Sequence, residues 1–154
     1  MAQSAPMSRR TRGYAHRVDI AAGAAIVWKT LTTTEALRRW CSPEAQISAR
    51  EGGLFRASVD RVAELEAHID VLLPERRMRI IYLPSKELPA PDSAIVDDFI
   101  LDGSDPGKTI VRLLGSGFPV SPEWDAFYLR LRTGWERAVA RLKVLVEQTV
   151  AEQA

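Results

Sequence analysis

The sequence has little cysteine, little histidine and almost no net charge. Its single cysteine, Cys41, cannot form an internal disulfide, which is compatible with a reducing cytoplasm. One cysteine and two histidines are too few for a zinc site of the usual type, and we expect neither a metal nor another cofactor. With 21 basic and 20 acidic residues, the net charge of +1 does not favour nucleic acid or a membrane surface.

The sequence also has no long apolar run. None of its apolar segments reaches the roughly 20 residues that cross a bilayer. Arg9 and Arg10 are not followed by the apolar segment of an export signal. We therefore expect a cytoplasmic protein with a flexible tail over residues 1–15 and a single domain over residues 16–150. No phosphate-binding loop, nucleophile elbow or metal-spaced cluster occurs in it.

A stripe of large apolar residues marks the C-terminal part of the chain. It recurs at steps of three and four residues, the spacing of one helix face. Ser121 suits the N-cap and Pro122 the first helical position, so the pattern predicts a helix from Pro122 to Glu147. This much aromatic area needs a broad partner surface. The stripe comprises Trp124, Phe127, Tyr128, Leu131, Trp135, Ala138, Leu142 and Leu145.

The rest of the chain predicts short strands and two short helices. Alternation of polar and apolar residues is strict from Ala63 to Leu73, and turn-forming residues separate the other extended segments. Short strands joined by short turns favour an antiparallel meander. We therefore predict an α+β fold in which a curved antiparallel sheet of six or seven strands surrounds the C-terminal helix. The expected strands are 17–21, 54–59, 63–73, 78–83, 94–101 and 109–115, and the short helices are 24–31 and 35–40.

Several segments, in this order, resemble one known family. They are Ala25–Leu31 with Glu35–Trp40, Gly52–Arg56, Asp70–Met78, and Gly115–Phe118 leading to Gly134-Trp135. Together they are similar to the START-like (SRPBCC) superfamily, in the bacterial branch like the activator of Hsp90 ATPase homologue C-terminal domain. The resemblance implies a helix-grip fold with a cavity between sheet and C-terminal helix, which in relatives holds apolar ligands.

The chain departs from this family at two points near the implied cavity mouth. Many relatives have a tryptophan at the end of the central hairpin, where this chain has Tyr82-Leu83-Pro84. The turn over residues 59–62 lacks the usual glycine. Ligand identity is therefore not transferred from any relative.

The leading interpretation is non-catalytic binding of a small hydrophobic or aromatic molecule in that cavity. For the aromatic stripe, ordinary core packing is an equally weighted alternative. The expected partner is the small molecule itself, and a chaperone contact or a homodimer contact stays open. The residues expected to line the cavity are Trp28, Trp40, Phe55, Tyr82, Phe99, Phe118, Trp124, Phe127, Tyr128, Leu131 and Trp135.

Catalytic groups are harder to identify. His68 shares the polar side of its strand with three acids, and Cys41 is better explained as a small buried hydrophobe than as a reactive thiol. Asp97 and Asp98 are adjacent in a strand and point to opposite faces, so they do not act as a pair. No catalytic residue is predicted.

Two alternatives to simple binding remain. One is an enzyme similar to the polyketide cyclases, in which Tyr82 or an inward-facing arginine polarises a carbonyl. Arg56 and Arg112 are the candidates for that arginine, although an outward orientation is favoured for both. The other alternative is a protein-binding module akin to the Hsp90 activator domain.

Overall fold

The computed structural model describes residues 10–59, 64–85, 88–89 and 94–153. Within them one seven-stranded antiparallel sheet has the order β1-β7-β6-β5-β4-β3-β2. The α+β helix-grip prediction is confirmed. The elements are β1 (Thr11–Ile20), α1 (Ala24–Thr32), α2 (Thr34–Trp40), β2 (Gln46–Ile47), β3 (Leu54–Ser58), β4 (Glu64–Leu73), β5 (Arg77–Tyr82), β6 (Val96–Asp105), β7 (Lys108–Pro119) and α3 (Pro122–Gln153).

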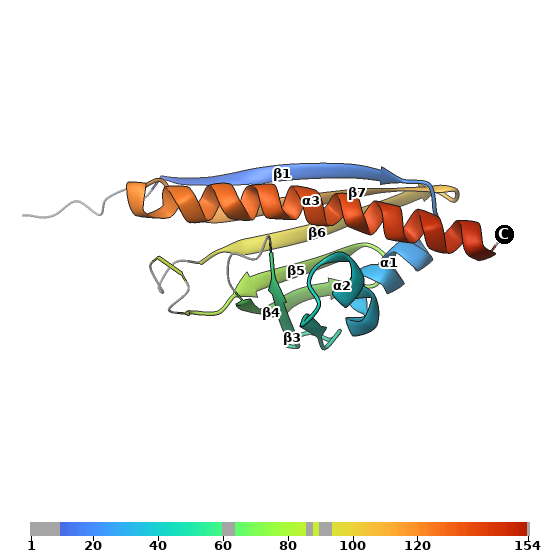
Figure 1. The fold of residues 1–154 in the computed structure, drawn as a ribbon, viewed down its shortest axis with the longest axis horizontal. Coiled ribbons are helices and arrows are strands. Elements are labelled where there is room, and N and C mark those ends of the chain that lie inside the picture. Colours follow the sequence, from blue (N-terminus) through green and yellow to red (C-terminus); the bar gives the residue numbers. More distant parts are fainter. Residues whose placement is uncertain (1–9, 60–63, 86–87, 90–93, 154) are drawn as a thin grey trace, which may run out of the picture.

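The helix α3 begins where the sequence predicts and ends six residues later. All eight stripe residues are buried, so this face of the helix meets the sheet as expected. Figure 1 shows α3 running along the sheet beside β1 and β7, with α1 and α2 near its C-terminal end. The sheet therefore supplies the broad surface that the aromatic stripe needs.

The first strand is longer than predicted. Residues 11–15, which the sequence assigns to the flexible tail, belong to β1 and pair with the end of β7. The tail assignment is therefore wrong for these residues. The sequence shows no apolar alternation there because of Gly13, Ala15 and the nearby arginines. A register shift between Arg12 and Tyr14 also interrupts the pairing of β1 with β7.

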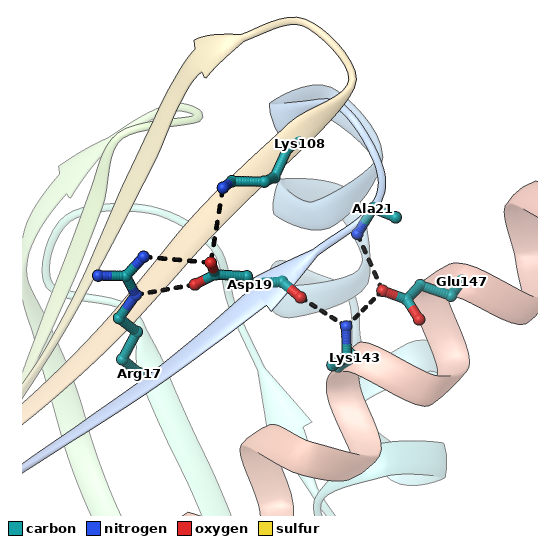
Figure 2. A network of polar contacts seen from close by, with 6 residues as sticks. All are labelled: Arg17, Asp19, Ala21, Lys108, Lys143 and Glu147. Atoms are coloured by element: carbon teal, nitrogen blue, oxygen red, sulfur yellow. Dashed lines mark hydrogen bonds and ion pairs between the residues drawn. The ribbon is translucent and has the colours of Figure 1, made fainter.

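A polar network fixes the end of β1 to α3 (Figure 2). The Lys143 ammonium donates to the backbone carbonyl of Asp19 at 2.5 Å and to the Glu147 carboxylate at 2.7 Å. That carboxylate also accepts from the backbone N–H of Ala21 at 2.9 Å. These bonds lower the pKa of Glu147, the one from Ala21 most. The same end of β1 is held to β7 by the Lys108–Asp19 ion pair.

The outer face of the sheet carries charged pairs. Arg77 donates to both carboxylate oxygens of Asp98, and Arg79 pairs with Asp70. Residues that alternate with these point inward and are buried, as the strand period requires. In the turn predicted at 59–62, residues 60–62 lie outside the described residues.

Candidate functional site

A buried carboxyl group lies in the interior between the sheet and α3. Asp97 on β6 is fully buried, and each of its carboxylate oxygens accepts one hydrogen bond. The Tyr14 hydroxyl donates to Oδ1 at 2.5 Å, and the Tyr82 hydroxyl donates to Oδ2 at 2.6 Å. Three strands thus bring one acid and two phenols together.

The strand register explains how Tyr14 reaches Asp97. Tyr14 on β1 faces Gly115 on β7, and Gly115 in turn faces Asp97 on β6. A Cβ added at Gly115 would lie only 2.3 Å from Cζ of Tyr14. The glycine therefore leaves room for the phenol ring to lie across β7 and contact the strand beyond it.

Burial changes the acid–base properties of this cluster. Desolvation raises the pKa of Asp97 to about 6, while the hydrogen bonds from Tyr14 and Tyr82 and the nearby indole N–H of Trp135 act in the opposite direction. Burial, together with the nearby Asp97 charge, raises the pKa of both tyrosines well above the usual value of 10. Near neutral pH, Asp97 is therefore the member of the cluster that changes charge.

Trp135 on α3 brings a further donor to the same place. Its indole Nε1 is buried and has no hydrogen-bond partner of normal geometry among the described residues. It is nevertheless close enough to lower the pKa of Asp97 and of Tyr82. This N–H is therefore an unpaired donor beside the carboxyl. Most polar groups in a protein core have a hydrogen-bond partner, and a buried donor without one costs free energy.

Two clusters of aromatic rings adjoin the polar cluster, one through Trp135 and one through Tyr14. The Trp135 cluster consists of Trp135 with Trp40, Phe55 and Phe99, whose ring centroids lie 5.4–6.4 Å from that of Trp135. The Phe118 cluster consists of Phe118 with Tyr14, Trp124, Phe127 and Tyr128, at 5.3–6.5 Å from Phe118. Tyr14 therefore belongs both to an aromatic cluster and to the polar one.

Of the residues predicted to line the cavity, all but Trp28 are buried in the core between the sheet and the helices. Trp28 is partly buried against this core. The Trp135 and Phe118 clusters hold most of them, and Tyr82 belongs to the polar group. Whether these side chains line an open cavity stays a prediction.

The other candidates lie away from this interior. Arg56 faces outward beside Glu64, Glu66 and Gln46. Arg112 alternates with buried β7 residues and is likewise on the outer face. Neither arginine is an inward-facing ligand for a carbonyl.

His68 lies on the polar side of β4, and Cys41 lies near Tyr82. His68 is partly exposed there, as predicted. Although part of the Cys41 residue reaches solvent, burial raises the pKa of its thiol to about 12. The thiol is therefore protonated at neutral pH, in agreement with its interpretation as a small apolar side chain.

Sequence reasoning missed Asp97 and Tyr14. From the sequence, Asp97 stands out only as the neighbour of Asp98. The overlooked signal is that Asp97 alternates with Ile95 and Phe99, so it occupies the apolar face of its strand. An acid in such a register is buried and needs partners. Tyr14 falls within the predicted tail, and only its pairing with Gly115 on β7 reveals where its ring lies.

Three surface pockets lie elsewhere. One of about 310 Å³ lies between α1, α2 and the end of α3, and its lining includes Lys29, Arg39 and Thr149. A second of about 350 Å³ shares Arg39 and lies along α3 beside Val144. The third, of about 470 Å³, borders the turn between β4 and β5. None of the predicted site residues lines them.

Neither a metal centre nor a membrane span is found in the part of the chain that the structure describes. No group of three or more His, Cys, Asp or Glu side chains there is arranged to hold a metal ion. No helix within the same residues is long and apolar enough to cross a membrane.

The fold and its interior define a class of protein. One long C-terminal helix held by a curved antiparallel sheet, with two short helices after the first strand, is the helix-grip architecture of START-like proteins. The family model described as "Activator of Hsp90 ATPase homolog 1-like protein" matches residues 21–147. The chain belongs to this family.

Solved structures support the same fold. A protein from Mesorhizobium loti is 22% identical with a TM-score of 0.76, covering 90% of this chain and 98% of its own. The Aha1 dimer from Colwellia psychrerythraea is 18% identical with a TM-score of 0.72, covering 88% and 96%. A norcoclaurine synthase point mutant from Thalictrum, in complex with a transition-state analogue, is 14% identical with a TM-score of 0.68, covering 93% and 98%. At these identities the likeness shows the fold alone. No curated protein matches the chain.

Proposed function

We propose that the chain binds a small hydrophobic or aromatic molecule between the sheet and α3, with the Asp97 cluster as its polar contact. The observation that carries this proposal is the fully buried carboxyl of Asp97, held by two tyrosine hydroxyls beside the unpaired indole N–H of Trp135. Small-molecule sites typically combine apolar and aromatic walls with a few convergent polar groups. The two aromatic clusters and this polar group have that composition.

The bound molecule would lie among the rings of the Trp135 cluster. Because these ring centroids are 5.4–6.4 Å apart, binding requires the rings to separate. Trp135 itself is fully buried on the face of α3 that meets the sheet. Its fluorescence and its indole N–H therefore report directly on occupation of this interior.

The proposal is tested with freshly purified protein. Native mass spectrometry is expected to reveal a co-purifying small molecule. If the protein is empty, it is expected to bind the neutral apolar dye Nile red in a saturable way. The variant Trp135→Phe is expected to weaken dye binding at least severalfold, whereas the matched variant Trp28→Phe, at the edge of the core, leaves it unchanged. Absence of any bound molecule and of saturable dye binding would refute the proposal.

A second candidate function is catalysis. It is favoured by one observation: the pKa of Asp97 is raised to about 6, within the range in which a carboxylate serves as a general base near neutral pH. In an enzyme similar to the polyketide cyclases, Asp97 would remove a proton next to a carbonyl that the Tyr82 hydroxyl polarises. This candidate predicts conversion of a synthetic poly-β-ketone thioester, which Asp97→Asn abolishes without abolishing binding. Unchanged substrate after prolonged incubation would remove it.

The remaining partner predictions concern macromolecules. A protein-binding role like that of an Hsp90 activator stays a prediction, checked by the ATPase rate of added Hsp90. The Colwellia structure is of a dimer, which supports keeping a homodimer contact as a further prediction. Sedimentation velocity checks that contact. The cytoplasmic location likewise stays a prediction, checked by cell fractionation.

A further inference from the structure

The carboxylates on the two faces of the sheet have different partners. On the outer face, Asp98 is paired with Arg77 and Asp70 is paired with Arg79. On the inner face, Asp97 is fully buried and bonded to two neutral phenols. No lysine, arginine or histidine among the described residues forms a hydrogen bond or ion pair with it. Of these three carboxyls, the one buried from water is the one without a cation partner.

This arrangement is costly for the protein alone. An ionised carboxylate in an apolar interior loses its hydration, and hydrogen bonds from neutral groups compensate only part of the loss. A buried carboxylate without a cation is therefore complementary to a positive charge, and the neighbouring rings of Trp135 and Phe99 are complementary to an apolar group.

We infer that the molecule bound in this interior is a hydrophobic amine, whose protonated nitrogen donates a hydrogen bond to Asp97 while its apolar part lies among the aromatic rings. The inference rests on the proposed function and specifies the ligand class for the same site. Each carboxylate oxygen accepts more than one hydrogen bond, so the amine does not have to displace Tyr14 or Tyr82.

The groups around Asp97 support this choice over other ligand charges. Tyr14 on β1 and Tyr82 on β5 stay neutral, and so does the Cys41 thiol that lies near Tyr82. Asp98, the neighbouring residue on β6, points to the outer face, and Trp135 on α3 does not titrate. A ligand carboxylate would bring a second anion to Asp97, and a neutral ligand would leave Asp97 without a counter-ion.

The test compares three ligands with the same ring system and different charge. They are 2-(2-naphthyl)ethylamine, the neutral 2-(2-naphthyl)ethanol and 2-naphthylacetate, each titrated into the full chain at pH 7.5 by isothermal calorimetry. The amine is expected to bind roughly tenfold or more tightly than the alcohol, the gain typical of a hydrogen bond between charged groups. The acetate is expected to bind more weakly than either.

The variant Asp97→Asn tests the origin of the preference, because it keeps the shape of the side chain and removes its charge. It is expected to bind amine and alcohol within about twofold of each other. A wild-type measurement gives the same information without a variant: amine affinity should fall below pH 6 as Asp97 is protonated, whereas alcohol affinity should not change.

The outcomes separate this inference from the proposed function. If the alcohol binds as tightly as the amine, or if Asp97→Asn keeps the full amine preference, the inference is wrong and the binding function stands. If amine affinity does not change between pH 7.5 and pH 5, the inference is likewise wrong. If none of the three ligands binds and the chain also fails to bind Nile red, the proposed function fails with it.

Discussion

The phenol ring of Tyr14 lies over the backbone of Gly115, which faces it on the neighbouring strand. Any Cβ at position 115 would lie 2.3 Å from Cζ of this ring. We predict that Gly115→Ala displaces Tyr14 from Asp97 and lowers the free energy of unfolding by about 2 kcal/mol, a typical cost of overpacking. Urea denaturation monitored by tryptophan fluorescence measures this loss.

The control for this prediction is Gly107→Ala, in the turn between β6 and β7. There the nearest atom to an added Cβ is 3.7 Å away, an ordinary contact. The control should change stability by less than about 0.5 kcal/mol. The effect of Gly115→Ala should also be much smaller in a Tyr14→Ala background, because the two positions are in contact. Equal effects in both backgrounds would contradict this explanation.

Loss of the Tyr82 hydroxyl should destabilise the fold more than loss of a hydroxyl that donates to a neutral backbone carbonyl. In Tyr82→Phe, Oδ2 of the buried Asp97 loses its donor, which we expect to cost about 2 kcal/mol. The matched control is Tyr128→Phe, whose hydroxyl donates to the backbone carbonyl of Gly13 at 2.5 Å. That bond joins neutral groups and should be worth about 1 kcal/mol. Chemical denaturation at pH 7 compares the two, and a neutral effect of Tyr82→Phe would show that the bond does not stabilise the fold.

Stability should depend on the ionisation of Asp97 in the direction opposite to that of a salt-bridged acid. Its pKa is about 6 in the folded chain, against an ordinary value of 3.8, so the folded state holds the proton more tightly. The binding of this proton stabilises the fold by about 3 kcal/mol. This stabilisation is complete below pH 4 and is lost as pH rises through 6. The measurement is the unfolding free energy of the wild type minus that of Asp97→Asn between pH 4 and pH 7. A constant difference, or one that grows with pH, would disprove the assignment.

Cys41 should react slowly as long as the chain is folded. Burial raises the pKa of its thiol to about 12, so very little thiolate exists at pH 8. We predict that iodoacetamide modifies the folded chain at least roughly 100-fold more slowly than the chain in 8 M urea. Mass spectrometry over time gives both rates. Rates within tenfold of each other would mean that the thiol is accessible and reactive.

Most of the fold follows from the sequence because its periodic patterns are long. The stripe from Trp124 to Leu145 fixes one face of α3, and the alternation in β4 fixes one face of the sheet. The early part of β1 was not predicted, because Gly13 and Ala15 carry no apolar alternation. Its pairing with β7 joins residues about a hundred positions apart, which local patterns do not encode.

The candidate site was only partly predictable for a related reason. Its aromatic residues belong to the periodic patterns, so their burial could be expected. Asp97 breaks the apolar pattern of its own strand, and the phenols that compensate for it come from β1 and β5. Only the register that aligns Tyr14, Gly115 and Asp97 brings the cluster together, and register is a property of the folded sheet.

The binding of a small molecule in the interior beside Asp97 can be observed at the indole N–H of Trp135. The chain has four tryptophans, and replacing each by phenylalanine assigns the four indole signals in a ¹H–¹⁵N correlation spectrum. During titration with 2-(2-naphthyl)ethylamine, the Trp135 signal should move and saturate, while the Trp28 signal at the edge of the core stays in place. A Trp135 signal that moves with neither 2-(2-naphthyl)ethylamine nor Nile red, or movement confined to Trp28, would contradict the proposal.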